Sequence, residues 1–366
     1  MKFERRDSDS GVEDTRYRPG RLALRWLPYL LILLPAALSL AFVGAFGVNV
    51  VVRDQWEMVR LFAELASGTL SFGDLWATHN EHQFFFPRIA MLVLGTLSDW
   101  NNLAEMYLIQ VCLLVTLAIL FLAFRRDVGS NRPFLFVPVA FLILSFRQWS
   151  NMLWGYQLTF ALTLLSSVLS LFFLRTATLA WQAGRRGSGG AAFVAALSGA
   201  TVAAGSSIQG LLVWPAGLLP LLAARLTASE KAVFTGIWTS AGVGVWSAYF
   251  LGYEAHLGSD SSLPNPLADP ALGVGFFLSL LGNSLTSRPG GALACGLLLV
   301  VLAAAVAILA RRARTVADYS FWLSLVALSF LILLAITAGR GGGTEGALAS
   351  RYTTFSLIAV ASLYVA

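Results

Sequence analysis

The chain has 366 residues, of which 57% are hydrophobic and only 12% carry a charge. A soluble domain of this length carries about 25% charged residues, so the composition excludes an ordinary soluble enzyme. The net charge of +6 does not indicate a nucleic-acid partner, because the basic residues of membrane proteins gather in cytoplasmic loops and set the orientation of the chain. The two cysteines, Cys112 and Cys295, lie in apolar runs and lack the spacing of a metal site.

The apolar residues gather in repeated runs that are about as long as the roughly 20 residues needed to cross a bilayer. Inside lipid, the backbone can satisfy its own hydrogen bonds only as a helix or as a closed barrel, and long unbroken apolar runs exclude the barrel. The sequence therefore predicts an all-α fold, a polytopic transmembrane bundle of about ten helices.

The N-terminal part of the chain predicts a leader, a first span and an outer loop. Residues 1–25 carry many arginines and are predicted to be disordered and cytoplasmic. The first apolar run, residues 26–50, has no small-residue cleavage site and is predicted to stay in place as a signal anchor. Residues 51–101 contain amphipathic pieces but no clean span, so we expect an outer loop with helices on the membrane surface. Residues 26–366 would then form a single transmembrane bundle.

Further spans are predicted where apolar runs alternate with basic loops. These spans cover residues 102–124, 133–146, 158–174, 191–205, 208–224, 232–251, 291–310 and 318–338. The run at residues 271–285 is short, and a full crossing there would place Arg311, Arg312 and Arg314 outside. We therefore predict a re-entrant or surface-lying segment at this point. The last apolar run, after Tyr352, is short and lacks a basic anchor, as expected of a piece of a longer chain.

With the N-terminus in the cytoplasm, this topology places every polar and aromatic cluster on the outer face. The clusters are Asp54 and Glu57; His79, Glu81 and His82; Gln148, Trp154, Tyr156 and Gln157; Gln209; Glu254 and His256; and Arg340, Glu345, Arg351 and Tyr352. The inner loops carry little besides arginine, lysine and small residues. An enzyme that acts at one membrane face needs such a one-sided site, whereas an alternating-access transporter more often carries polar groups at mid-membrane depth.

Several short segments resemble a known family. They are DQWE, HNEHQFFFPR, WGYQ, GSSIQGLLVWPAGLLPLL and ASRYTTFSL. With the acid after the first span and the long first outer loop, they make the chain resemble the GT-C superfamily of polyprenyl-phosphate-sugar-dependent membrane glycosyltransferases, in a bacterial branch. The resemblance covers residue 26 to the C-terminus. The family commonly has paired acids in the first outer loop, whereas here Gln55 follows Asp54 and the next acid is Glu57.

The resemblance implies a catalytic role for Asp54. A hydroxyl that attacks an anomeric carbon needs a base to take its proton, and an outer-loop carboxylate can supply that base. Asp54 would then be the general base or would orient the acceptor. The alternative is that Asp54 caps an interfacial helix or pairs with Arg53 or Arg88.

The departing lipid phosphate calls for a cation. A guanidinium binds phosphate oxygens in a bidentate manner, and the start of a helix adds a positive dipole. Arg351 stands at the predicted start of the last helix, with Arg340 and Arg88 as second choices. The alternative for each is an arginine that reaches to lipid headgroups.

The histidine-rich segment allows three interpretations. On a helix, His79 and His82 would share one face, and Asp54 could complete a divalent-cation site, which makes such a cation the one cofactor that we consider. No H-E-x-x-H pattern supports that metal site. The other interpretations of His79, Glu81 and His82 are a cluster that hydrogen-bonds the sugar or acceptor and a structural polar network.

The other candidates are aromatic and amide side chains at the outer ends of spans. Trp154 or Trp56 could stack on a sugar, although interfacial aromatic belts account for most such residues. The full set of predicted substrate-binding residues is Glu57, His79, Glu81, His82, Arg88, Trp154, Gln209, Arg351 and Tyr352.

The function expected from these features is an integral-membrane glycosyltransferase. It would move a sugar from a polyprenyl-phosphate donor to a lipid, glycan or protein acceptor at the outer face of a bacterial cytoplasmic membrane. Its partners would be these substrates and membrane lipid, with no nucleic acid. The alternatives are a flippase or transporter of lipid-linked glycans and an accessory subunit of envelope assembly.

Overall fold

The computed structural model describes residues 19–251, 253, 269–339 and 345–366. In this part of the chain the fold is helical apart from one pair of two-residue strands. The first helix, α1, runs over Pro19–Phe46 and so begins within the segment expected to be a disordered leader. The rest of that leader, residues 1–18, lies outside the described residues.

Seven helical stretches among the described residues are long and apolar enough to cross a membrane. They are Trp26–Phe46, Asn102–Asp127, Pro133–Met152, Gly155–Gln182, Arg186–Ala204, Pro289–Arg312 and Ser320–Gly339. The chain is therefore built as a multi-pass helical membrane protein, as predicted. Three shorter apolar helical stretches, Phe85–Leu97, Ile208–Ala223 and Pro270–Gly282, complete the set.

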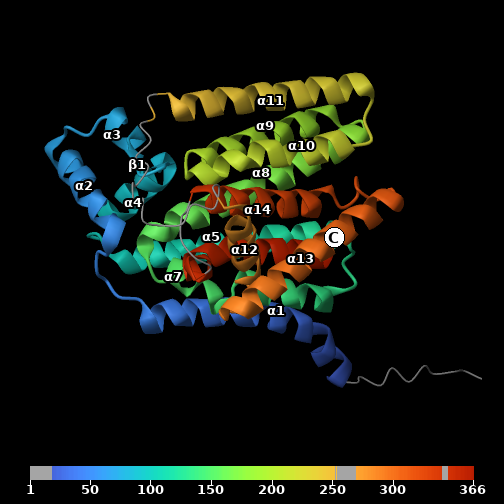
Figure 1. Ribbon diagram of the computed structural model, residues 1–366, viewed down its shortest axis with the longest axis horizontal. Coiled ribbons are helices and arrows are strands. Elements are labelled where there is room, and N and C mark those ends of the chain that lie inside the picture. Colours follow the sequence, from blue (N-terminus) through green and yellow to red (C-terminus); the bar gives the residue numbers. More distant parts are fainter. Residues whose placement is uncertain (1–18, 252, 254–268, 340–344) are drawn as a thin grey trace, which may run out of the picture.

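Most helices of the bundle run close to the longest axis of the molecule, whereas α13 lies obliquely to them (Figure 1). Besides α1, the helices of the bundle are α5 (Asn102–Asp127), α8 (Leu158–Gln182), α9 (Arg186–Ala204), α10 (Val213–Ala223), α11 (Ala228–Phe250), α13 (Pro289–Arg312), α14 (Ser320–Gly339) and α15 (Thr353–Val365). Helix α8 is central, because it packs against α5, α9, α10 and α14.

Small residues allow α8 and α9 to approach closely. The Ser170 hydroxyl donates a hydrogen bond of 2.8 Å to the carbonyl of Ala196 on the neighbouring helix. A Cβ at Gly199 would lie 3.1 Å from the carbonyl oxygen of Ser166. Small residues at such interfaces let helices pack by van der Waals contact, which drives helix association in lipid.

The third span is not one continuous helix. It consists of η2 (Pro133–Phe136), α6 (Val137–Ile143), η3 (Phe146–Gln148) and α7 (Trp149–Met152), and η4 (Gly155–Gln157) then begins the fourth span. The helix predicted over residues 133–146 therefore ends earlier than expected, at Ile143. Polar side chains satisfy the freed backbone: Gln148 Nε2 donates to the Ile143 carbonyl (2.6 Å), and the Ser145 hydroxyl accepts from the Arg147 amide (3.3 Å). Irregular backbone at membrane depth requires such partners.

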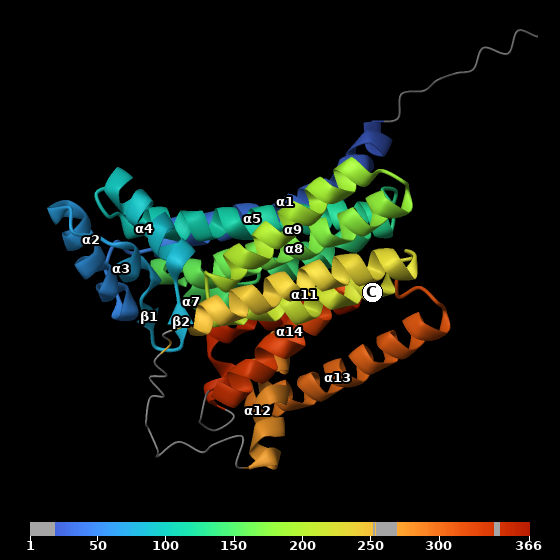
Figure 2. The same cartoon turned by 90° about the horizontal axis from the view of Figure 1, so that it is seen from above.

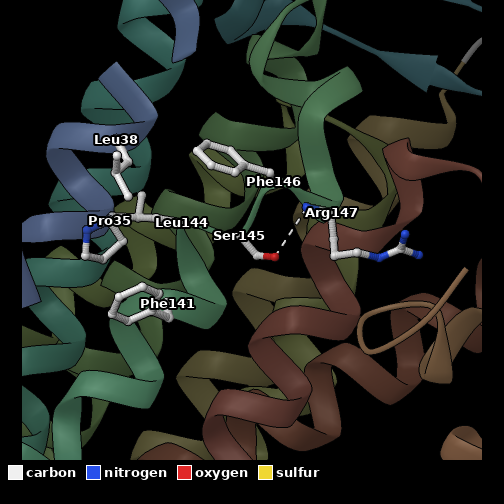
Figure 3. Close-up of a pocket in the computed structure, with 7 residues that line it drawn as sticks. All are labelled: Pro35, Leu38, Phe141, Leu144, Ser145, Phe146 and Arg147. Atoms are coloured by element: carbon white, nitrogen blue, oxygen red, sulfur yellow. Dashed lines mark hydrogen bonds between the residues drawn. The ribbon is translucent and has the colours of Figure 1, made fainter. Parts of the chain in front are cut away.

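An open groove of about 510 Å³ runs between α1 and this break (Figure 3). Its lining is Pro35, Leu38, Phe141, Leu144, Ser145, Phe146 and Arg147. The Arg147 guanidinium points away from the groove (Figure 3) and bonds instead to Asn283, with Nη2 donating to the Asn283 carbonyl at 2.8 Å.

The segment predicted to be an outer loop forms a small unit at one end of the bundle (Figure 2). It contains η1 (Arg53–Trp56), α2 (Glu57–Ser67), α3 (Phe72–Trp76), β1 (Thr78–His79), β2 (His82–Gln83) and α4 (Phe85–Leu97). Helix α2 is amphipathic, with Met58 and Leu61 buried and Arg60 exposed. We call this end of the molecule the hairpin end, after the β1–β2 pair, and the opposite end the arginine end.

The short segment predicted at residues 271–285 corresponds to α12 (Pro270–Gly282), which lies across the direction of the long helices (Figure 2). It crosses α13 at very short range, because a Cβ at Gly296 would lie 1.9 Å from the Leu278 carbonyl oxygen. After α14, the one-turn helices η6 (Gly346–Leu348) and η7 (Ser350–Tyr352) lead into α15.

Candidate functional site

Loops that are far apart in the sequence meet at the hairpin end. The Phe86 amide donates to the Gly205 carbonyl (3.1 Å), which joins α4 to the turn after α9. Gln83 is held by α11, since Tyr249 Oη accepts from its amide (3.0 Å) and its Nε2 donates to the Tyr249 carbonyl (2.8 Å). Tyr249 Oη also donates to the Glu81 carbonyl (3.2 Å). Most of the predicted polar residues that the structure describes therefore lie together at the hairpin end.

Four predicted residues form a connected cluster that begins at Asp54. His79 Nε2 lies 3.9 Å from the Asp54 carboxylate, and His79 Nδ1 contacts the Glu57 carboxylate. The other Glu57 oxygen lies 3.5 Å from Nη2 of Arg88. Asn80 Nδ2 lies within hydrogen-bond distance of His79 Nε2, at 3.2 Å. We call Asp54, Glu57, His79 and Arg88 the acid–histidine cluster.

The Arg88 guanidinium is buried at the base of this cluster. Its Nη1 donates to carbonyl groups at the end of α3, those of Leu75 (3.1 Å) and Ala77. Desolvation lowers the pKa of Arg88, but an arginine remains protonated even so. Arg88 therefore holds Glu57 and the end of α3 together.

Asp54 has neither of the two arginine partners that the alternative interpretation gave it. Arg88 pairs with Glu57, and the Arg53 guanidinium lies over the Trp154 ring, 5.6 Å from its centre. The Asp54 side chain is 50% exposed, and His79 is its one ion-pair partner among the described residues. It caps no helix, since Val52 and Trp56 occupy the cap positions of η1 and α2. An exposed carboxylate beside a histidine remains available to a ligand.

The turn that carries Asp54 is anchored from below by Gln55, which sequence reasoning missed. Gln55 is 1% exposed, and its Nε2 donates to Glu105 Oε2 (2.6 Å) and to Asn102 at the start of α5. Asn102 in turn donates through its amide to Asn49 Oδ1 (2.8 Å). The sequence did contain a signal for this contact. Glu105 is a carboxylate inside an otherwise apolar span, and such a residue is stable there only with a polar partner.

The two histidines do not share a helix face. They lie opposite one another in the antiparallel pair, and Asn80 makes the turn with a φ of 50°. His82 is buried, stacks on Phe84 with ring centres 5.0 Å apart, and lies 3.4 Å from Glu81 through Nε2. Its Nδ1 accepts from the Ile208 amide at 3.4 Å. Within the described ranges, no group of three metal-ligating side chains comes together, so the geometry favours a structural role for His82.

Aromatic rings line the cluster on its bundle side. Tyr156 packs edge-on against Phe84 and His79, with ring centres 5.6 and 6.1 Å apart, and stacks on Trp154 at 6.0 Å. Trp154 also donates through Nε1 to the Val52 carbonyl (3.1 Å), so protein contacts already engage this ring. Trp56 is 63% exposed and is the freer of the two tryptophans proposed to stack on a sugar.

Arg351 lies at the same end, just before α15. Asn151 Nδ2 donates to its carbonyl (2.9 Å) and to the Thr354 hydroxyl (2.7 Å), which fixes the turn. The guanidinium lies over the ring of Tyr352 at 5.1 Å and donates to the Tyr352 hydroxyl (3.3 Å). No carboxylate pairs with Arg351 among the described residues, so its charge is open to an anion.

Buried amides at this end carry unused acceptors. Gln209, a predicted binding residue, is buried, and its Oε1 makes no hydrogen bond within the described part of the chain. The same holds for the Oε1 atoms of Gln55, Gln83 and Gln157. Buried acceptors without partners are rare, and each can take a proton from a hydroxyl group. Glu254, His256 and Arg340, which were also predicted here, lie outside the described residues.

Comparison with known proteins adds no relative. No family model matches the chain, and no curated protein or solved structure matches it.

Proposed function

We propose that the protein is an integral-membrane glycosyltransferase that moves a sugar from a polyprenyl-phosphate donor to a lipid, glycan or protein acceptor. One observation carries the proposal: the irregular segment at residues 147–157 bonds to the turns of both key residues. Trp154 donates to the Val52 carbonyl beside Asp54, and Asn151 donates to the Arg351 carbonyl. The Asp54 carboxylate and the Arg351 guanidinium thus lie at the same end of the bundle, and residues 147–157 contact the turns that carry both.

The roles follow from the chemistry of these two groups. Asp54 would take the proton of the attacking acceptor hydroxyl, since it is exposed and unpaired except for His79. Arg351 would stabilise the charge that develops on the departing phosphate. The Glu57 and Arg88 pair would hold His79 in place beside Asp54. Buried glutamine acceptors would bind sugar or acceptor hydroxyls.

The groove between α1 and the broken third span supports a lipid-linked donor. Its volume of about 510 Å³ and its mainly apolar lining suit part of an isoprenoid chain. It is formed by two stretches that are long and apolar enough to cross a membrane, so a lipid could enter it from the bilayer.

The test is a transfer assay with purified protein and a panel of polyprenyl-phosphate sugars. Asp54→Asn should lower the rate by about 100-fold or more, the size of a lost general base. Asp99→Asn is the matched control, because Asp99 is an exposed acid in the same outer segment. Arg351→Gln should also lower the rate, whereas Arg288→Gln, an exposed arginine, should not. Full activity of Asp54→Asn would overturn the assignment of the base.

A lipid-linked-glycan flippase is the second candidate. Gln110 favours it, because this residue of α5 is fully buried and neither atom of its amide has a hydrogen-bond partner in the described chain. Polar groups inside spans mark transport paths in other membrane proteins. The test is translocation of a lipid-linked sugar in proteoliposomes. Loss of this translocation in Gln110→Leu, with retention in Asp54→Asn, would support the flippase over the transferase.

A further inference from the structure

The arginine end holds a cluster of charges that the proposed reaction does not use. Helix α8 packs against α5, α10 and α14, and each of these helices brings charged residues to this end. The charged groups close enough to interact with Arg175 of α8 are Arg126, Asp127, Asp318 and Arg225. We call these five residues the arginine-end cluster.

Both carboxylates of this cluster are already paired. Asp127 accepts two hydrogen bonds from Arg126, through Nε (2.6 Å) and Nη2 (3.0 Å), and a third from Trp322 Nε1 (3.0 Å). Asp318 accepts from Arg225 Nη2 at 2.9 Å. A bidentate pair of this kind satisfies a carboxylate well. Neither carboxylate makes a hydrogen bond or an ion pair with Arg175.

Arg175 is therefore a buried cation without an anion. It is only 4% exposed, and its side chain makes no hydrogen bond or ion pair with the residues that the structure describes. Its Nε is shielded and unpaired, as is Nη1 of Arg126. An arginine does not lose its proton in a protein, and a buried charge without a partner is destabilising.

The position of Arg175 is suited to a ligand from the membrane. It lies about two turns, or roughly 10 Å, before the end of α8. The Arg126 guanidinium nearby lies over the rings of Phe172 (5.3 Å) and Phe321 (5.8 Å), so apolar surface surrounds the charges. Three guanidinium groups and two carboxylates leave one net positive charge, which a single phosphodiester would neutralise.

We propose that the arginine-end cluster binds a phosphate group, with the guanidinium groups of Arg175 and Arg126 as donors, and that an anionic membrane lipid supplies it. Basic pockets between helices at one side of a membrane bind lipid headgroups in this way. A free phosphate ion has the same chemistry and is the other source that the experiment separates. Binding would stabilise the folded protein by mass action.

The experiment uses the purified full chain after its native lipid has been removed. Phosphatidylglycerol, phosphatidylcholine and inorganic phosphate are titrated separately, with the melting temperature and the bound lipid in native mass spectra as readouts. Phosphatidylglycerol should raise the melting temperature and stay bound in a ratio of about one per chain, whereas phosphatidylcholine should not. Equal stabilisation by inorganic phosphate would assign the site to the free ion. Wild-type protein that responds alike to both lipids and not to phosphate overturns the proposal.

Three variants make the result specific to the cluster. Arg175→Gln should weaken phosphatidylglycerol binding by about tenfold or more, while Arg311→Gln, an exposed arginine at the same end, should not. Asp318→Asn removes one carboxylate from an exposed position and should strengthen binding, because the net positive charge rises. Arg225→Gln frees Asp318 to pair with Arg175 and should weaken binding. If Arg175→Gln does not fold, the other two variants still test the site, because Asp318→Asn should raise the affinity for phosphatidylglycerol and Arg225→Gln should lower it. Equal affinity in these two variants would overturn the proposed site.

Discussion

Gln55 donates a hydrogen bond of 2.6 Å to Glu105, and this bond ties the turn that carries Asp54 to the first turn of α5. Both side chains are 1% exposed, so water cannot replace the bond if it is lost. Asp54 itself has no comparable anchor among the described residues. Its position therefore depends on a pair of residues that would not touch the substrate.

Loss of the Glu105 carboxylate should loosen the Asp54 turn. Glu105→Leu leaves the Gln55 amide buried with Asn102 as its remaining partner, at a cost of about 1–3 kcal/mol in the free energy of unfolding. Glu105→Gln keeps an acceptor oxygen and should retain most of the stability. In a transfer assay, Glu105→Leu should lower kcat more than Glu105→Gln does. Equal stability and rates in both variants would show that this bond does not position the turn.

Gly155 should tolerate no side chain, for a related reason. A Cβ at this position would lie 2.2 Å from Oε2 of Glu105 and 2.9 Å from its Cβ. Gly155→Ala should therefore displace Glu105 and destabilise the protein by about 1–3 kcal/mol, the usual cost of overpacking. Gly236→Ala is the control, since nothing lies within 4 Å of a Cβ there. Thermal unfolding of the two variants makes the comparison, and similar melting temperatures would contradict the prediction.

Arg88 should be required for the shape of the acid–histidine cluster. Arg88→Met removes the donor to the Leu75 and Ala77 carbonyls and leaves Glu57 without its cation. Because Glu57 is partly exposed, we expect a loss of about 2 kcal/mol, below the range for a fully buried pair. The exposed Arg60 pairs with Glu64 and Asp74, and Arg60→Gln should cost less than about 1 kcal/mol. Chemical unfolding of both variants measures the difference, and equal losses would refute it.

The crossing of α12 and α13 should depend on Gly296. Gly296→Ala would place a Cβ 1.9 Å from the Leu278 carbonyl oxygen, so the two backbones must separate. We expect a loss of about 2 kcal/mol, measured by thermal unfolding. Gly290→Ala, near the start of the same helix, meets nothing within 4 Å and should be neutral. A neutral Gly296→Ala would mean that α12 does not pack against α13 in this way.

The stability contributed by Asp74 should depend on pH. Hydrogen bonds from the Ser71 hydroxyl and amide, with one from Arg60, lower the Asp74 pKa from 3.8 to about 2. A lowered pKa means that the carboxylate stabilises the folded state above pH 3.8 and that this contribution disappears as the pH falls toward 2. Asp74→Asn should therefore melt below the wild type at neutral pH, with a difference that shrinks in acid. A melting-temperature difference between Asp74→Asn and the wild type that does not change with pH would contradict this explanation.

The spans were largely predictable because hydrophobic length is a local property. The span expected from residue 102 begins at Asn102, and the one expected over residues 291–310 is observed as Pro289–Arg312. The break in the third span was not predictable, because the apolar pattern continues through Leu144. Side chains satisfy the backbone there, among them Ser145 and Gln148 of the same segment and Ser350 and Thr353 of a distant one, so the break is compatible with lipid.

The sequence by itself determined the class of the molecule, because the cost of polar groups in lipid can be read from composition and order along the chain, whereas the role of Asp54 stays a prediction. Only the tertiary structure decided the partners. Glu57 engages His79, Glu105 lies beneath Gln55, and Arg175 has no ion-pair partner among the described residues. The first two contacts join residues from different secondary-structure elements, and tertiary packing, which no local pattern encodes, sets which of them meet.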